Sequence, residues 1–229
     1  MTFPRFRSLI LSAAALGAVL PPAAAHQMWI EDLPSPASLV VRFGEFGEGV
    51  EKSPGYLDSL TPVEVWQPAA KAGAEPVVRV STKKSEFFSL NGEGIVPELL
   101  AQTGFPVMGK PGAPGKLPLF YLRWHQAGPA AAATSKEPAM TMDIVPEGAG
   151  VVRVYFRGQP VPQAALTLWL PGGVESPLTA DAEGRATVPA VKAGLILITV
   201  NQKEPLAGFQ TGKVYDTTSH NASLAWRQS

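Results

Sequence analysis

Histidine is the residue type in this sequence best suited to metal chemistry. The chain contains three histidines and no cysteine, so a transition-metal site must use nitrogen and oxygen donors rather than thiolates. The histidines are His26, His125 and His220. Imidazole nitrogen suits nickel, copper and cobalt, and three imidazoles that converge in the fold would hold such an ion. The sequence therefore predicts a site for a divalent transition metal ion with these three residues as ligands.

His26 has a second potential donor because of what precedes it. Residues 1–25 have the features of a secretory signal peptide: two arginines near the start, the apolar stretch Leu9–Leu20, and the small residues Ala23–Ala25 at the cleavage position. Cleavage there makes His26 the first residue of the mature chain. Its free α-amino group, with a pKa of about 7.7–8.0, can then chelate a metal together with the imidazole Nδ1. We expect a periplasmic or secreted protein.

The composition argues against several other classes of partner and reaction. The 19 basic and 19 acidic side chains balance, so neither nucleic acid nor an anionic membrane surface is an expected partner. After the signal, the longest apolar run is Gly194–Val200, far shorter than the roughly 20 residues of a membrane helix. No Gly-x-Ser-x-Gly elbow, P-loop or dinucleotide glycine pattern occurs. We expect a mature protein without a membrane span that is not an enzyme.

Each histidine also has a structural interpretation. Cleavage could expose His26 by coincidence, His125 could pair with a neighbour at the surface, and His220 could be a solvated loop residue. Among the other candidate donors, Met140 and Met142 offer thioethers on one face of a strand, although such methionines more often fill a core.

Trp29 and Trp124 could line a metal-binding pocket, although large aromatic side chains also dominate protein cores.

Short runs of β-branched and aromatic residues between turns indicate the elements that position these side chains. The chain has 22 glycines and 23 prolines, which separate the runs. Ser38–Phe43 and Leu119–His125 are predicted strands. In the second strand, Phe120, Leu122 and Trp124 should share one face, with His125 on the other. Val96–Thr103, by contrast, has apolar residues at helical spacing and predicts one short helix.

The glycine-rich stretch Pro146–Gly150 has the composition of a linker between domains. It divides the chain into an N-terminal β-rich metal-binding domain at residues 26–146 and a C-terminal β-sandwich domain at residues 151–229. We therefore predict a mainly β protein with two β-sandwich domains in tandem, of the immunoglobulin-like or prealbumin-like kind.

The C-terminal half resembles the prealbumin-like or carboxypeptidase-regulatory-like β-sandwich modules. The resemblance rests on the turn Gly158–Pro160, the following segment Ala165–Thr167, the segment Thr179–Gly184 and the pair Ala193–Gly194. Such modules are structural far more often than catalytic, so the resemblance implies a supporting role for this half.

The whole chain after the signal resembles a bacterial family of periplasmic proteins of unknown function associated with nickel and cobalt uptake transporters. Ala25–Trp29 matches an Ala-His-x-x-Trp opening at the cleavage site, Ile144–Pro146 matches a step between halves, and Ser223–Trp226 matches the last strand. The resemblance implies a transporter as partner. Gln27 and Met28 replace an acidic-apolar pair that is usual in the family, so the carboxylate that could orient the histidine is missing there. Glu31 or Asp32 could substitute for it.

Three functions follow from these features. The first is periplasmic binding of nickel, cobalt or copper through His26, for delivery to an uptake transporter. The second is a copper redox enzyme in which His26 and another histidine form a histidine brace. The third is a non-catalytic β-sandwich protein of adhesion or assembly, in which His26 has no metal. We favour the first, because nitrogen ligands permit exchange of the ion.

Overall fold

Short runs of β-branched and aromatic residues become strands throughout the structure. The computed structural model describes residues 26–35, 37–69, 74–92, 94–134 and 137–229. Within these ranges the chain forms eighteen strands and two short 3-10 helices, η1 (Tyr56–Ser59) and η2 (Gly128–Ala130). The expectation of a mainly β protein is therefore confirmed. The strands form three sheets, here called the N-terminal, central and C-terminal sheets.

The N-terminal sheet has the order β1-β2-β7-β6, and β3 also pairs with β2. Its strands are β1 (Gln27–Pro34), β2 (Ala37–Glu45), β3 (Gly49–Val50), β6 (Ser81–Lys83) and β7 (Phe88–Leu90). The C-terminal sheet has the order β10-β11-β12, and β15 also pairs with β11. Its strands are β10 (Met142–Gly148), β11 (Val151–Phe156), β12 (Gln159–Pro160) and β15 (Arg185–Thr187).

The central sheet combines strands from both halves of the chain in the order β14-β13-β16-β18-β9-β8-β4-β5, with β17 paired to β18. The N-terminal half supplies β4 (Glu64–Gln67), β5 (Val77–Arg79), β8 (Glu98–Gly104) and β9 (Gly115–His125). The C-terminal half supplies β13 (Ala165–Leu170), β14 (Val174–Thr179), β16 (Gly194–Glu204), β17 (Gly208–Gln210) and β18 (Lys213–Gln228).

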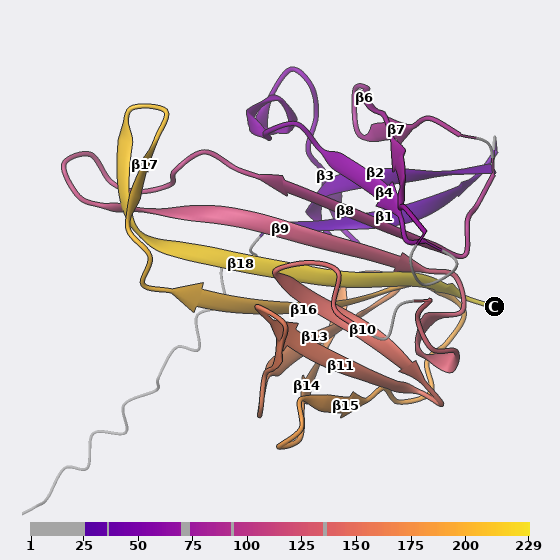
Figure 1. Cartoon of the computed structure of the whole chain (residues 1–229). Helices are drawn as coiled ribbons and strands as arrows, with labels where there is room; N and C mark the ends of the chain where they lie inside the picture. The colour runs from indigo at the N-terminus through magenta and orange to yellow at the C-terminus, as the bar shows by residue number, and fades with distance from the viewer. Residues whose placement is uncertain (1–25, 36, 70–73, 93, 135–136) are drawn as a thin grey trace, which may run out of the picture.

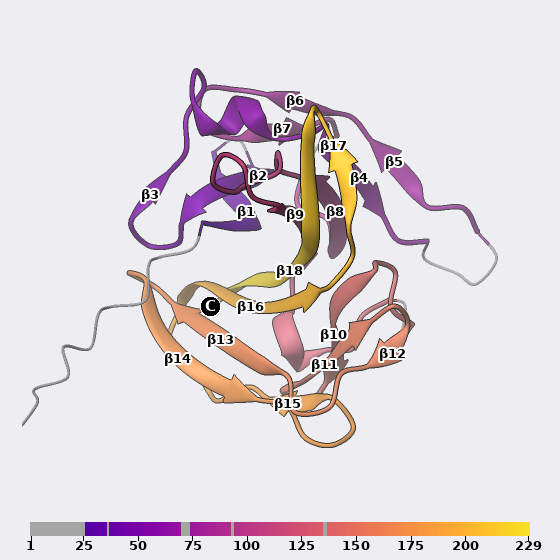
Figure 2. The ribbon, with the colours of Figure 1, turned by 90° about the vertical axis from the view of Figure 1, so that its left-hand side faces the viewer.

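The central sheet is the middle layer of the molecule. Figures 1 and 2 show the N-terminal sheet over one side of it and the C-terminal sheet on the opposite side. Each side buries its own apolar core. The first core, which includes Ile30, Val41 and Leu122, lies against the N-terminal sheet. The second core, which includes Ile144 and Ile198, lies against the C-terminal sheet.

Strand β9 shows how one element contributes to both cores. Phe120, Leu122 and Trp124 point into the first core, as the alternation of the sequence predicts. Tyr121 points into the second core, and Arg123 on the same face binds Asp143 of β10. The expectation that these aromatic residues share one face is confirmed.

The prediction of a short helix at Val96–Thr103 is wrong, because most of this segment belongs to strand β8. Leu99 and Ala101 enter the first core while Leu100 enters the second. A strand buried on both faces shows no alternation of apolar and polar residues, so its sequence imitates a buried helix. Pairing with β4 on one side and β9 on the other fixes the extended conformation.

The linker predicted at Pro146–Gly150 is also not found, because this stretch ends β10 and turns directly into β11. The two strands pair from Met142 opposite Phe156 to Gly148 opposite Val151. The halves predicted at residues 26–146 and 151–229 are instead joined through the central sheet. There β9 and β18 pair in parallel from Gly115 opposite Tyr215 to Trp124 opposite Ala225.

The signal peptide predicted at residues 1–25 lies outside the described residues. Among the residues that are described, no helix has the length and apolar character needed to cross a membrane.

Candidate functional site

His26 lies immediately before β1, at the edge of the N-terminal sheet, and its imidazole is held on one side by a carboxylate. The Nε2 atom is hydrogen-bonded to Oε1 of Glu51. The ring packs against Phe43, with centroids 5.2 Å apart, and against the edge of Tyr56, at 6.1 Å. The His26 side chain is 38% exposed, so the ring is fixed in orientation and still open to solvent.

The pairing of β2 with two neighbours brings Glu51 to His26. Residue Gly44 near the end of β2 lies opposite Gln27 of β1 and also opposite Val50 of β3. The next residue, Glu51, donates its backbone N–H to the carbonyl oxygen of Phe43 at 2.7 Å. His26, just before β1, and Glu51, just after β3, therefore meet beside Phe43 of β2.

The loop after Glu51 is tied down by Asp58. Its carboxylate accepts hydrogen bonds from the hydroxyl of Ser53 and the backbone N–H of Gly55, each at 2.8 Å, and pairs with Lys83 of β6. The hydrogen bond from Lys83, followed by those from Gly55 and Ser53, lowers the pKa of Asp58 to about 2. The carboxylate stays ionised at neutral pH and fastens this loop, which also carries Tyr56, to the sheet.

The contact with Glu51 determines which nitrogen of His26 can bind a metal. The carboxylate of Glu51 accepts a hydrogen bond from the N–H at Nε2, which leaves the lone pair on Nδ1. Nδ1 has no hydrogen-bond partner among the described residues. In metal sites, a ligating histidine commonly donates its other ring N–H to a carboxylate, which fixes the tautomer and raises its basicity. The arrangement suits a metal ligand acting through Nδ1.

His125 is buried at the end of β9, with 6% of its surface exposed. Its Nδ1 lies 2.7 Å from the carbonyl oxygen of Gly128, at the start of η2. The imidazole therefore donates to the backbone and holds the turn after β9. This is the pairing with a neighbour considered above, although it is buried rather than at the surface.

His220 lies in β18 on the second-core face of the central sheet, and only 2% of its surface is exposed. The hydroxyl of Tyr121 lies 3.0 Å from its Nδ1, and Oε2 of Glu204 lies 3.2 Å from its Nε2. Burial lowers the pKa of His220, against the opposing effect of the Glu204 carboxylate. Both ring nitrogens already have partners, and Arg157 also binds Glu204, at 2.8 Å.

The structure does not bring the three histidines together. His220 lies opposite Leu119 in the parallel pair, six residues before His125 on β9, which at about 3.3 Å per residue is a separation of about 20 Å. Both are on the second-core face, whereas His26 packs on Phe43 of the first core. No group of three or more potential metal-binding side chains is found within the described ranges. The expected three-histidine site is therefore not assembled.

The other candidate residues from the sequence are packed in the two apolar cores. Met140 and Met142 are buried in the second core, and Trp29 and Trp124 in the first.

Neither carboxylate expected to orient His26 is used for this. Glu31 accepts hydrogen bonds from Trp29 and Arg42, and Asp32 binds Arg227. Glu51 takes that role. The turn at residues 46–48, which folds β3 back along β2, was the signal that could have identified it.

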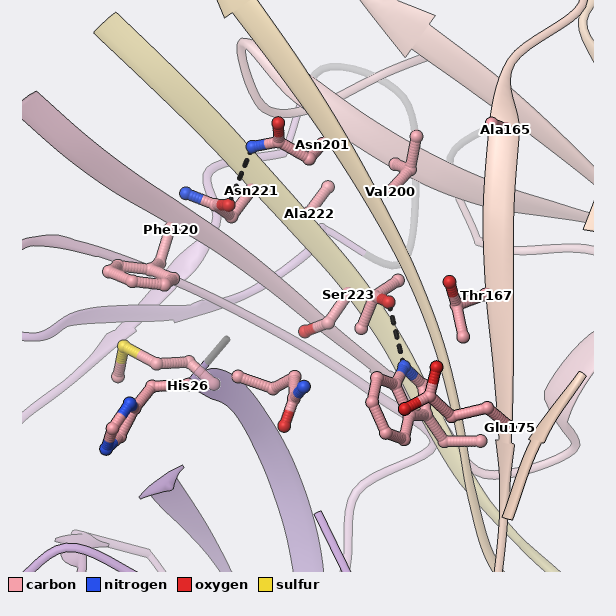
Figure 3. Close-up of a pocket in the computed structure, with 14 residues that line it drawn as sticks. His26, Phe120, Ala165, Thr167, Glu175, Val200, Asn201, Asn221, Ala222 and Ser223 are labelled. Atoms are coloured by element: carbon pink, nitrogen blue, oxygen red, sulfur yellow. Dashed lines mark hydrogen bonds between the residues drawn. The ribbon is translucent and has the colours of Figure 1, made fainter. Parts of the chain in front are cut away.

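A pocket of about 410 Å³ adjoins His26 on the first-core side of the central sheet. It lies between the start of β1 and the face of β13, β16 and β18 that the N-terminal sheet leaves uncovered (Figure 3). The His26 imidazole points away from the polar side chains on those strands, so the ring faces Glu51 and the backbone of His26 borders the pocket.

Comparison of the chain with models of known protein families gives no match, and a search among curated proteins gives none either.

Proposed function

We propose that the chain, once cut after Ala25, binds a divalent transition metal ion outside the cytoplasm through His26 and delivers it to a membrane uptake transporter. The ion is nickel, cobalt or copper. The observation that carries the proposal is the hydrogen bond between Nε2 of His26 and Glu51, which leaves the lone pair of Nδ1 for the ion. The resemblance to proteins associated with metal-uptake transporters supports the same function.

The α-amine and Nδ1 of His26 form a six-membered chelate ring with the ion. This donor set is smaller than the three-imidazole site expected from the sequence, because His125 and His220 lie elsewhere. Two nitrogens leave several coordination positions to water or to the donors of a recipient protein. Such a site binds less tightly than a closed cage and exchanges its ion more readily, which is the property that a carrier needs.

The copper redox alternative is less well supported. A histidine brace needs a second histidine beside the N-terminal one, and in the described part of the chain both other imidazoles are buried with partners of their own. The adhesion or assembly function remains the alternative to metal carriage, and the experiment below separates the two.

The test is metal titration by calorimetry of protein that begins at His26, with Ni(II), Co(II) and Cu(II). We expect one ion per chain, and we expect binding to be lost when one alanine is added before His26, because the amine becomes an amide. Glu51→Gln should weaken binding by about 10–100-fold. His125→Gln, at a buried and distant position, is the matched control and should bind normally.

The pH dependence provides a second measurement. The amine and the imidazole must both lose their protons to bind the ion, so occupancy should fall as the pH drops below about 6.5–7. Equal binding by the alanine-extended and the mature protein, or retention of the ion well below pH 5, would rule out this donor set.

A further inference from the structure

The pocket beside His26 contains a row of hydroxyl groups on neighbouring strands. Thr167 of β13 lies opposite Thr199 of β16, and Thr199 lies opposite Ser223 of β18. Paired residues point to the same face, and neighbouring strands are about 4.8 Å apart, so the three hydroxyl groups form a ladder at that spacing. Figure 3 shows all three strands contributing to one wall of the pocket.

One of these hydroxyl groups lacks the partner that its burial requires. Ser223 is 3% exposed, yet its Oγ has no hydrogen-bond partner among the described residues. Leaving a buried polar group unsatisfied costs about 1–3 kcal/mol, so native structures rarely do so without a reason. In Figure 3 the Ser223 hydroxyl points into the open space toward Phe120 and His26. A ligand in the pocket would supply the missing partner.

The rest of the ladder is arranged to present hydrogen-bonding groups. Thr199 Oγ1 accepts a hydrogen bond from Nε1 of Trp169 at 2.9 Å, which leaves the Thr199 hydroxyl proton free for a ligand. In the adjoining row, Asn201 donates to Oδ1 of Asn221 at 2.8 Å, so these two amides hold each other in place. The polar wall is therefore largely fixed before a ligand arrives.

The charge and the apolar surfaces of the pocket restrict the ligand class. Among the described residues, no lysine or arginine lines it, and the only carboxylate is that of Glu175 on β14, opposite Trp169. An anion would be repelled and would find no cation to bind. Phe120 and Trp169 supply aromatic surface next to the hydroxyl ladder. The volume of about 410 Å³ lies within the range of small-molecule sites.

We propose that this pocket binds an uncharged polyhydroxylated ring of monosaccharide size. The spacing of hydroxyl groups along the ladder is comparable to that of alternate hydroxyl groups around a six-membered sugar ring. The Ser223, Thr199 and Thr167 hydroxyl groups form hydrogen bonds to ligand oxygens. Glu175 accepts from ligand hydroxyl groups, and the aromatic surfaces cover the C–H face of the ring. The His26 imidazole does not face this pocket, although the backbone of His26 borders it.

The experiment uses metal-free mature protein in the presence of a chelator, so its outcome does not depend on metal binding. D-glucose, D-galactose, D-mannose and D-xylose are titrated by calorimetry and by saturation-transfer NMR, with D-glucuronate as the anionic control. At least one neutral sugar should bind with a dissociation constant of about 1 mM or lower. Glucuronate should bind more weakly than the matching neutral sugar.

Two variants locate the binding. Ser223→Ala and Thr167→Val should each weaken binding about tenfold by removing a hydrogen bond to the ligand. Ser223→Ala should not lower the thermal midpoint, since the hydroxyl has no protein partner to lose. Thr187→Val, at an exposed position on β15, is the control and should bind normally. Absence of saturable binding at about 10 mM, preference for glucuronate, unchanged binding by Ser223→Ala, or destabilisation by that variant would each overturn the proposal.

Discussion

At the scale of single residues, His220 is an ionisable side chain whose buried environment disfavours the protonated form. The imidazole is stacked on Tyr121, with centroids 5.9 Å apart, and meets the edge of Phe156 at 4.9 Å. Burial between these rings removes water from the imidazole and is the main reason that the pKa of His220 is lowered. Glu204 opposes the shift, while the guanidinium of Arg157 reinforces it.

This environment predicts loss of stability in mild acid. An unfolded chain binds a proton at His220 near the ordinary histidine pKa of about 6.5, whereas the folded chain binds it only at lower pH. Stability is therefore full above about pH 6.5 and declines as the pH falls from there toward the lowered pKa. Urea unfolding between pH 8 and pH 5 should show this decline.

The comparison with His220→Gln isolates the contribution of the one imidazole. The variant should lose part of the pH dependence in this range, whatever its overall stability. Glu204, which binds both Arg157 and His220, has a pKa below its usual value, so it stays ionised throughout this range. Identical pH dependence in the two proteins would contradict the assignment.

At the scale of elements, the turn between β2 and β3 and the turn between β13 and β14 lie in direct contact. A Cβ atom added to Gly47 would lie 2.1 Å from the backbone nitrogen of Gly173. Gly47 has a φ of +84°, a region that glycine occupies without strain. The N-terminal sheet thus approaches the central sheet at a point where neither turn has room for a side chain.

Gly47→Ala should therefore destabilise the protein more than the same change at Gly172. Gly172 has a similar φ of +80°, but a Cβ there would meet nothing within 4 Å. Gly172→Ala should cost about 1–2 kcal/mol from backbone strain alone. Gly47→Ala adds an overlap that should cost a further 1–3 kcal/mol or so, measured by urea unfolding. Equal losses in the two variants would show that the turns can separate freely.

The sequence predicts a strand well where its two faces carry different kinds of residue, even when both faces are buried. The alternation of aromatic residues along β9 was sufficient to assign its two faces. In β8 successive residues enter opposite cores. The resulting unbroken run of apolar residues lacks the alternation that would identify a strand. Local pattern also cannot show which distant strands pair. Tyr121 of β9 and His220 of β18 are in contact although they are 99 positions apart.

The candidate site could likewise be predicted from the sequence only in part. His26 could be identified because its importance depends on local sequence, namely the residues that precede it. Its partner Glu51 was not identified, because the turn at residues 46–48 does not by itself determine the register of β1 and β3 along β2. Ser223 carries no chemical signal in the sequence, since its significance arises only from burial without a partner.

At the scale of the whole molecule, a buried ionic cluster connects the central and C-terminal sheets. Arg123 of β9 is fully buried and pairs with Glu98 of β8 and with Asp143 of β10. Thr134 donates its backbone N–H to the second carboxylate oxygen of Glu98. Arg123 binds both oxygens of Asp143, and the backbone N–H of Ala139 also donates to Oδ2. Burial of charge is tolerated only when each group is paired in this way.

Because both cores are built on the same central sheet, the described part of the molecule should unfold as one cooperative unit. Arg123→Met leaves two buried carboxylates without their cation and should lower the free energy of unfolding by about 3–5 kcal/mol. Fluorine NMR of fluorotryptophan can follow Trp29 in the first core and Trp226 in the second during urea unfolding. Both signals should shift to lower urea together.

Lys52→Met is the control for loss of a cation, because Lys52 pairs with Glu86 at the surface, where the lysine side chain is 68% exposed. That variant should unfold at nearly the same urea concentration as the unmodified protein, since exposed ion pairs contribute little. A shift of the Trp226 signal in Arg123→Met without a shift of Trp29 would mean that the two cores unfold independently. The central sheet would then not transmit the loss of the ionic cluster from the second core to the first.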